Sequence, residues 1–218
     1  TPLNVIYSTE QLIKELNKNE EGIGREKLDH YMSIIKNNTK RLLKIINDLI
    51  DSSKIEHGSY NINIEEIDIV YVVEEAALSM KEYIGAKDIE LIVDPEIEEK
   101  IIEADKSEIE RCIVNIVGNA YKFTEPGGVI KVVIIDLGDS VRIEISDTGI
   151  GIDKKYHDLI FNRFNQVIDP SSEVKKGSGL GLTITKKIID LHNGDIYVKS
   201  IPGQGSKFII VLPVKQER

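Results

Sequence analysis

A run of regularly spaced apolar residues between positions 26 and 54 constrains the fold of this 218-residue chain most. Four of them recur every seven residues and two more are offset by four: Leu28, Ile35, Leu42, Leu49, Met32 and Ile46. Apolar residues at this spacing form one stripe along an α-helix, as in the seam of a coiled coil. Thr39 and Ser53 interrupt the second position of the repeat. The pattern predicts a long amphipathic helix that buries its seam against other helices.

A shorter helical pattern precedes this run, and its apolar face consists of Val5, Ile6, Thr9, Leu12, Ile13 and Leu16. Residues 17–25 are polar and include Gly22 and Gly24, which indicates a loop. Two amphipathic helices joined by a short loop form an antiparallel hairpin. We expect its long seam to pack against a partner, most simply a second copy, which gives a dimeric four-helix bundle.

The pattern changes at residues 56–59, after which strand and helix signals alternate. We therefore predict two domains, a helical hairpin over residues 1–58 and a second domain over residues 59–218. The second domain is expected to be α+β, with helices on one face of a mixed sheet. Its predicted strands cover residues 60–69, 89–93, 100–104, 129–136, 141–146, 196–200 and 206–212, and its predicted helices cover 70–86, 107–123 and 178–191.

Composition excludes several classes of protein. The net charge of −9 argues against a nucleic-acid partner, because phosphate backbones attract basic surfaces. No apolar run approaches 18 residues, so we expect no membrane-spanning helix within the sequence and a soluble chain. Cys112 is the single cysteine, which rules out an intrachain disulfide, and the four histidines show no metal-ligand spacing.

The predicted helix over residues 107–123 carries two stripes. Its apolar stripe is typical of a core face, whereas its other stripe includes Asn115, Asn119 and Lys122. Asparagine is a poor helix former, so a merely solvated face would more often carry Glu or Lys at these positions. Amide oxygens suit a hard cation and the ammonium suits phosphate. The alternative is that the two amides simply cap a packing edge.

Two glycine-rich stretches follow. Residues 147–152 (DTGIGI) come at the end of an alternating strand, where the Asp147 carboxylate can face a pocket and the glycines allow close backbone approach or a tight turn. Residues 177–182 (GSGLGL) open an apolar helix, whose first N–H groups suit phosphate. The second spacing is G-x-G-x-G, not the Rossmann fingerprint, and the G-K-[ST] of a Walker loop is absent.

Taken together, these motifs resemble the catalytic region of sensor histidine kinases, within the gyrase, heat-shock chaperone, histidine kinase and MutL (GHKL) ATP-binding superfamily. The resemblance covers essentially the whole chain, since residues 47–56 (NDLIDSSKIE) resemble the dimerisation and phosphotransfer hairpin. The boxes, in chain order, are residues 115–124 (NIVGNAYKFT), 147–152, 161–164 (FNRF), 177–182 and 203–208 (GQGSKF). The implied fold is a GHKL-type α/β sandwich after the hairpin.

The resemblance implies a magnesium–ATP site. It implies that Asn119, helped by Asn115, holds Mg²⁺ against the phosphates and that Lys122 pairs with phosphate. Asp147 would accept a hydrogen bond from the adenine amino group. The other implied nucleotide-binding residues are Phe123, Gly149, Gly151, Ile152, Gly177, Ser178, Gly179, Leu180, Gly181, Leu182, Ser206 and Phe208. Gln166 stands where some relatives place a phosphate-contacting Arg, a departure from the pattern.

One position separates kinase from ATPase. ATP-hydrolysing relatives place a Glu, the general base for water, four residues before the metal-binding Asn, and Asn115 occupies that position here. An amide cannot accept a proton at neutral pH, so phosphoryl transfer to another nucleophile is favoured. The alternatives are a GHKL-type ATPase, a non-catalytic dimerising scaffold and an anti-sigma type serine kinase, against which the long hairpin argues.

The family's phosphoacceptor motif, His-Glu-x-x-Thr-Pro-Leu, is matched only at its tail by Thr1, Pro2 and Leu3. The acceptor histidine would therefore precede this sequence, which we expect to be part of a longer kinase whose cytoplasmic portion it forms and whose membrane association comes only through other segments. Thr1 matches the position that orients water for phosphatase action. The implied partners are a second copy through the hairpin and the receiver domain of a response regulator.

Overall fold

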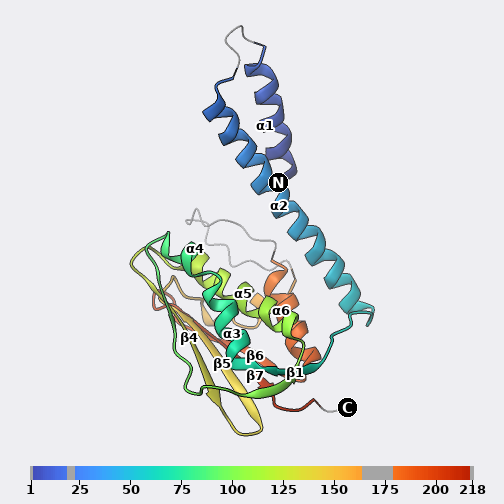
Figure 1. The fold of residues 1–218 in the computed structure, drawn as a ribbon, viewed down its shortest axis with the longest axis vertical. Coiled ribbons are helices and arrows are strands. Elements are labelled where there is room, and N and C mark those ends of the chain that lie inside the picture. The colour runs from blue at the N-terminus through green and yellow to red at the C-terminus, as the bar shows by residue number, and fades with distance from the viewer. Residues whose placement is uncertain (1, 19–22, 164–178, 217–218) are drawn as a thin grey trace. The chain divides into compact units, whose positions relative to one another are not determined.

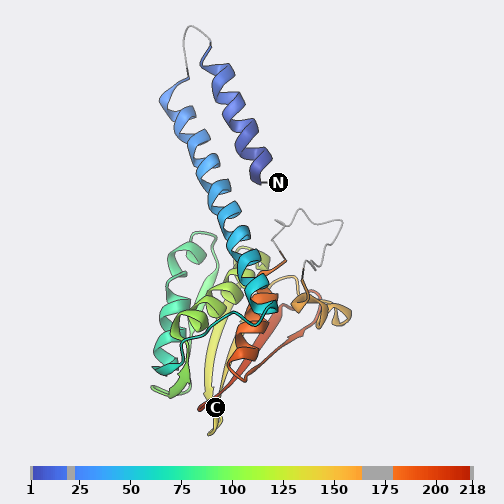
Figure 2. The ribbon, with the colours of Figure 1, turned by 90° about the vertical axis from the view of Figure 1, so that its right-hand side faces the viewer.

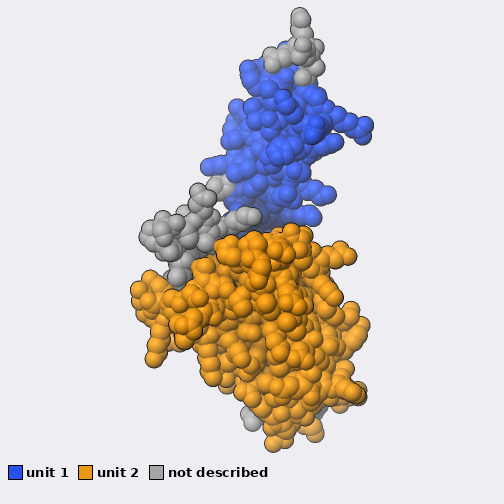
Figure 3. Space-filling view, turned by 90° about the vertical axis from the view of Figure 1, so that its left-hand side faces the viewer, with its two compact units in different colours: residues 1–57 blue, residues 58–218 orange. Residues whose placement is uncertain are grey.

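The structure is a computed structural model that describes residues 2–18, 23–163 and 179–216. The chain divides into two compact units, residues 1–57 and residues 58–218, which Figure 3 shows in blue and orange. Each unit is described separately below. None of the helices in the described ranges is both long enough and apolar enough to cross a membrane.

The first unit is an antiparallel helical hairpin, as predicted. Helix α1 (Pro2–Leu16) packs along helix α2 (Arg25–Glu56), and Figures 1 and 2 show the two side by side. Helix α1 turns Ile6, Thr9 and Ile13 inward, and Thr9 is buried with its hydroxyl donating to the carbonyl of Val5. On α2 the half-buried residues are Leu28, Tyr31, Ile34, Ile35, Asn38, Leu42, Ile45, Asp51 and Ile55.

The predicted seam on α2 is covered in part only. Leu28, Ile35 and Leu42 are half-buried, whereas the other three predicted members are exposed. The exposed fractions are 52% for Met32, 45% for Ile46 and 54% for Leu49. Residues at this spacing lie on one side of a helix, so the exposed members leave part of that side open for the predicted partner.

The second unit is an α+β domain with a five-stranded mixed sheet and a separate two-stranded sheet. The elements, in chain order, are β1 (Glu65–Asp68), α3 (Ile69–Leu78), α4 (Lys81–Gly85), β2 (Glu90–Val93), β3 (Ile101–Ala104), α5 (Lys106–Phe123), β4 (Val129–Asp136), β5 (Ser140–Asp147), two single-turn 3₁₀ helices (Lys154–Tyr156 and Leu159–Phe161), α6 (Gly181–Leu191), β6 (Asp195–Ser200) and β7 (Ser206–Pro213).

The strand order in the main sheet is β2-β4-β5-β7-β6. Strand β2 runs parallel to β4, and the other neighbours are antiparallel. The register pairs Asp147, the last residue of β5, with Ser206, the first residue of β7. Strands β1 and β3 pair antiparallel with Ile67 opposite Ile102. The topology thus brings the end of β5 beside the start of β7, where two of the predicted motifs meet.

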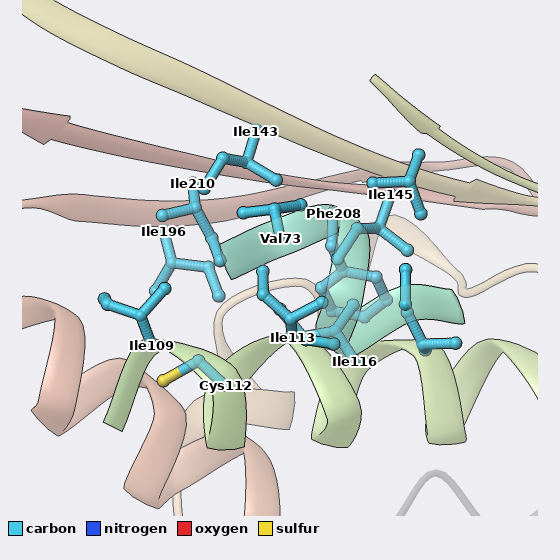
Figure 4. Packing of buried hydrophobic residues seen from close by; sticks show 14 of the residues in the cluster. Val73, Ile109, Cys112, Ile113, Ile116, Ile143, Ile145, Ile196, Phe208 and Ile210 are labelled. Carbon is cyan, nitrogen blue, oxygen red and sulfur yellow. The ribbon is translucent and has the colours of Figure 1, made fainter. Parts of the chain in front are cut away.

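The core lies between one face of the main sheet and the helices, as Figure 4 shows. Helix α5 contributes Ile109, Cys112, Ile113 and Ile116, and α3 contributes Val73. These side chains meet alternate residues of the strands, which point to the same face because strand side chains have a period of two. The labelled strand residues are Ile143, Ile145, Ile196, Phe208 and Ile210.

Three predicted boundaries were wrong for identifiable reasons. The helix expected over residues 70–86 is two helices, since α3 ends at Leu78 and Met80 precedes α4. The strand expected over residues 60–69 is shorter, since β1 covers only Glu65–Asp68, and the Asp68 carboxylate accepts from the Val70 N–H and starts α3. Helix α6 begins at Gly181 and not at residue 178, since Gly179 has φ of +72°.

Buried polar contacts connect the N-terminal end of α5 to the C-terminal end of α6. The Asp105 side chain caps α5 by accepting from the N–H groups of Ser107 and Glu108. The backbone N–H of Asp105 in turn donates to Nε2 of His192, at 2.9 Å, just beyond the end of α6. Nδ1 of this fully buried imidazole lies 2.8 Å from the carbonyl of Ile188. His192 is therefore a buried packing residue.

Candidate nucleotide site

The polar edge predicted on α5 exists and faces α6. Asn115, Asn119 and Lys122 are all half-buried, whereas the apolar stripe of the helix is buried in the core. The Asn115 amide nitrogen donates to the Thr185 hydroxyl of α6 at 2.9 Å. Because this bond fixes the amide, the Asn115 oxygen has a defined direction, and it lies against Gly181.

Gly181, the first residue of α6, is required for this contact. A Cβ atom there would lie 2.4 Å from the Asn115 Oδ1 atom, well inside van der Waals contact. Thr185 and Gly181 are one helical turn apart, so both approach Asn115 from the same face of α6. The two sequence motifs that contain Asn115 and Gly181 therefore meet directly, with the amide oxygen between them.

The other end of α5 meets the loop after β5. A Cβ atom on Gly149 would lie 2.4 Å from the carbonyl oxygen of Phe123, the last residue of α5. The N–H of Ile150 donates to that same oxygen at 3.3 Å. A glycine at position 149 is thus needed for close backbone approach, as predicted for this motif. The Lys122 ammonium lies 4.6 Å from the centre of the Phe123 ring.

Asp147 is buried at the end of β5, with 9% of its surface exposed. Burial raises the pKa of the Asp147 carboxyl, and hydrogen bonds from the N–H groups of Gly149 and Ser206 oppose this rise. The Gly149 bond is 2.8 Å long. Gly205 has φ of +83°, and a Cβ atom there would lie 1.9 Å from the Asp147 carbonyl oxygen. Only glycine fits at position 205, so the motif of residues 203–208 packs directly against the backbone of Asp147 and positions it.

A serine pair fixes the second glycine of the first motif. Gly151 has φ of +70°, and a Cβ atom there would lie 2.1 Å from the carbonyl oxygen of Ile201. The next N–H, of Ile152, donates to the Ser200 hydroxyl at 2.7 Å. That hydroxyl donates to the Gly205 carbonyl, so in the 3.1 Å contact between the two serines Ser206 is the donor. Ser206 thereby orients a hydroxyl beside Asp147.

The apolar residues of the predicted site lie on the core side. Phe208 is 4% exposed and stacks edge-on against Phe161, with ring centres 6.5 Å apart and planes at 83°. Ile152 and Leu182 are partly buried against the same core, and Leu180 is buried. These side chains form an apolar wall beside the polar groups of α5 and β5, which is the usual composition of a small-molecule site.

Comparison with known proteins identifies the family to which this arrangement belongs. Residues 104–216 match the family model described as "Histidine kinase-, DNA gyrase B-, and HSP90-like ATPase". Residues 1–58 match the "His Kinase A (phospho-acceptor) domain". The chain belongs to the sensor histidine kinase family. The family and the fold class expected from the sequence are thereby confirmed.

Relatives of this histidine kinase chain include two curated proteins. It is 39% identical over 194 residues to the hybrid signal transduction histidine kinase L of Dictyostelium discoideum, covering 86% of this chain and 11% of that protein. It is 34% identical over 220 residues to the non-motile and phage-resistance protein of Caulobacter vibrioides, covering 99% and 26%. The chain therefore spans only about a tenth to a quarter of these relatives.

A solved structure, "Crystal structure of histidine kinase ThkA in complex with response regulator protein TrrA", resembles the whole chain. The TM-score is 0.75 at 25% identity, and the match covers 98% of this chain and 58% of that one. The likeness extends over the hairpin and the α+β domain, so the histidine kinase fold accounts for both units.

Several predicted site residues lie outside the described part of the chain. These are Thr1, Gly177 and Ser178, together with Phe164 and Gln166. Gly179 is described, and its φ of +72° shows why glycine precedes α6.

Two hydroxyl residues at this candidate site were missed by the sequence analysis. Thr185 holds Asn115, and Ser200 links Ile152 to Gly205. Neither stands out in the sequence, because each is a single small polar residue in an otherwise ordinary helix or strand.

Proposed function

We propose that this chain is the dimerisation and ATP-binding region of a sensor histidine kinase that transfers the γ-phosphoryl group of ATP to a histidine. The observation that carries the proposal is the meeting of three motifs around α5. Asn115 contacts Thr185 and approaches Gly181 at one point of the helix, and Phe123 meets Gly149 and Ile150 at its end. The start of α6, which we propose to bind phosphate, and the buried Asp147 carboxylate thus flank the polar edge of α5.

The residues of α5 fit a magnesium ion bound together with phosphates. In the described residues no group of three His, Cys, Asp or Glu side chains could hold a metal. Amide oxygens are suitable ligands for Mg²⁺, which usually completes its shell with water and substrate phosphates. With its nitrogen bonded to Thr185, Asn115 presents its oxygen, and Asn119 lies one turn further along the same edge. Mg²⁺ would neutralise phosphate charge there, and Lys122 would add a positive charge.

Asp147 supplies the proposed selectivity for adenine. A carboxylate accepts hydrogen bonds, so it matches the exocyclic amino group of adenine and repels the carbonyl oxygen at the same position of guanine. A Cβ atom on Gly149 would lie 2.8 Å from the Asp147 Oδ1 atom, and one on Gly205 would lie 1.9 Å from the Asp147 carbonyl oxygen, so glycine at both positions keeps Asp147 in place. Ile152, Phe123 and Phe208 would contact the faces of the base, and Ser206 would add a hydroxyl beside it.

The choice between kinase and hydrolase follows from Asn115. Its amide cannot take a proton from water, so the site lacks a general base at this position. Catalysis then depends on positioning and on neutralising charge until an imidazole nitrogen attacks the γ-phosphorus. The bond from phosphorus to the β-phosphate oxygen breaks, a phosphorus–nitrogen bond forms, and ADP leaves. The match of residues 1–58 to a phospho-acceptor domain supports this assignment over a simple ATPase.

The proposed partners are a second copy and a response regulator. Large apolar side chains remain exposed along both helices of the hairpin, and a second hairpin would cover them. The ThkA structure contains a response regulator protein, which supports a receiver domain as the relay partner. No nucleic-acid partner is proposed, in agreement with the net charge of −9. Membrane association is proposed only through segments outside this sequence.

The test is calorimetric titration with ATP, with and without Mg²⁺. We expect Mg²⁺-dependent binding that Asn119→Ala and Asp147→Asn each weaken by about 30-fold or more, which corresponds to about 2 kcal/mol for a charge-assisted contact. Asp139→Asn is the matched control, since Asp139 lies in the exposed turn between β4 and β5. Normal affinity in both site variants would overturn the proposal, and rapid phosphate release without an acceptor would favour an ATPase.

A further inference from the structure

Lys87 binds the C-terminal end of α5 from the segment between α4 and β2. Its ammonium donates to the carbonyl of Thr124 at 2.6 Å and to the carbonyl of Tyr121 at 3.2 Å. The same ammonium lies 5.2 Å from the centre of the Tyr121 ring. We propose that Lys87 is a positioning residue for nucleotide binding, which it supports by fixing the last turn of α5. This inference rests on the proposed ATP site.

The last carbonyls of a helix have no partner in a following turn. On α5 the C-cap residue Thr124 and other elements supply the partners. The Ala120 oxygen accepts from both the N–H and the hydroxyl of Thr124. The Lys87 ammonium donates to the Tyr121 carbonyl oxygen, and the Ile150 N–H donates to the Phe123 carbonyl oxygen. One partner therefore comes from the proposed adenine motif and another from Lys87, so both act on the turn that carries Lys122 and Phe123.

The segment after Lys87 also holds the loop that follows α5. The Asp88 carbonyl accepts from the Gly127 N–H at 2.6 Å, and the Glu90 N–H donates to the Gly128 carbonyl at 3.0 Å. A Cβ atom on Gly128 would lie 2.8 Å from the Thr148 hydroxyl oxygen. Residues 87–90 thus reach the loop on one side while Thr148, next to Asp147, touches it on the other.

The positive charge of Lys87 has a specific role at this place. The C-terminus of an α-helix carries partial negative charge, which an ammonium on its carbonyls compensates. Tyr121 adds a ring face toward the ammonium, and Tyr83 of α4 packs on Tyr121 with ring centres 4.5 Å apart. Without the ammonium, two carbonyls of the last turn would depend on water alone. The turn would then be freer to move, and with it Lys122 and the Phe123–Gly149 contact.

The experiment compares ATP affinity in Lys87→Met, Lys87→Arg and the wild-type chain at a temperature where thermal melts show each to be fully folded. We expect Lys87→Met to weaken Mg²⁺–ATP binding by about tenfold, which corresponds to about 1.4 kcal/mol. Arginine keeps the charge at the helix end, so it should restore affinity to within about threefold of wild type. Lys81→Met is the matched control, because Lys81 is exposed on α4 nearby.

A purely stabilising role predicts a different result. Lys87→Met would then lower the melting temperature but bind ATP like the wild type once folded, which would overturn the proposal. Amide hydrogen exchange gives a second readout without nucleotide: we expect faster exchange at Thr124 and Ile150 and no change at Thr185. Lys87→Gln serves if the Met variant does not fold. If neither the wild type nor Lys81→Met bound ATP, the proposed function would be refuted. The exchange pattern would still test whether Lys87 fixes the last turn of α5.

Discussion

The two units of the chain differ in how far they bury their apolar side chains. In the described residues of the hairpin, the only buried residues are polar: Thr9, Asp48 and Ser52. In the α+β unit, α3, α5 and α6 bury Val, Ile and Ala side chains against the sheet, and the core is continuous. A unit that seals its own core can be stable alone, whereas a two-helix hairpin with exposed apolar stripes gains most of its stability from a partner.

The largest effect is expected in the core of the α+β unit. Ile113 is fully buried between α5 and the sheet, so Ile113→Ala leaves a cavity. We expect the free energy of unfolding to fall by about 3–4 kcal/mol, independently of protein concentration. Chemical denaturation followed by circular dichroism measures it. Val114→Ala on the same helix, where the side chain is 39% exposed, should cost under about 0.5 kcal/mol. Equal losses would contradict a sealed core.

The next effect concerns the buried contact between α5 and α6. His192→Phe keeps the ring volume but removes the partners of the Asp105 N–H and the Ile188 carbonyl. Leaving two buried polar groups unpaired should cost about 2–3 kcal/mol. The measurement is again denaturant unfolding, with His30→Phe in the exposed part of the hairpin as control. If the two variants unfolded at the same denaturant concentration, His192 would not tie the helices together.

A smaller, concentration-dependent effect is expected in the hairpin. Ile46 belongs to the predicted seam of α2 and is 45% exposed, so Ile46→Lys places a charge where we propose the second copy packs. We expect dimer dissociation to become easier by about 1–2 kcal/mol, measured by sedimentation over a range of protein concentrations. Asn47→Lys, on the adjacent exposed position, is the control. A monomeric wild type, or equal dissociation constants in the three proteins, would contradict the proposed dimer.

Periodicity made much of the fold predictable. The alternation of Val141, Ile143 and Ile145 predicted β5, and the apolar stripe from Ile109 to Ala120 predicted the buried face of α5. Both patterns arise because burial acts on one face of a regular element. The mixed character of the sheet also followed, since hairpins and helical connections alternate along the chain.

Contacts between distant residues could not be predicted in this way. The Asn115–Thr185 bond spans 70 positions and depends on how α6 packs on α5, so no local pattern records it. Which members of the predicted seam in α2 are covered could not be predicted either, because an apolar residue does not reveal which neighbour covers it. Similarly, the break between α3 and α4 comes at Ser79 and Met80, where the sequence contains neither Gly nor Pro.

The smallest expected effect shows that burial is not uniformly stabilising within the α+β unit. Burial raises the pKa of Asp147 above its usual value of 3.8. Burial would do the same for Asp105, but hydrogen bonds from Asn63, Ser107 and Glu108 together lower the pKa of that carboxyl below 3.8. The two carboxylates should therefore affect stability with opposite signs.

For Asp147, the folded chain binds a proton more tightly than the unfolded chain, so its contribution to stability declines as pH rises from 3.8 through the folded pKa. At pH 7 the ionised, buried carboxylate opposes folding. We expect Asp147→Asn to be more stable than wild type at pH 7, by under about 1 kcal/mol, although it binds ATP weakly. The gain should vanish well below pH 3.8, where Asp147 is protonated and neutral in the folded and in the unfolded chain. Asp105→Asn should instead be less stable than wild type at pH 7, because the lowered pKa gives stability that is present above 3.8 and lost as pH falls through the folded pKa. Denaturant unfolding at pH 7 and at acid pH distinguishes them, and a destabilised Asp147→Asn at pH 7 would show that the N–H groups of Gly149 and Ser206 outweigh burial.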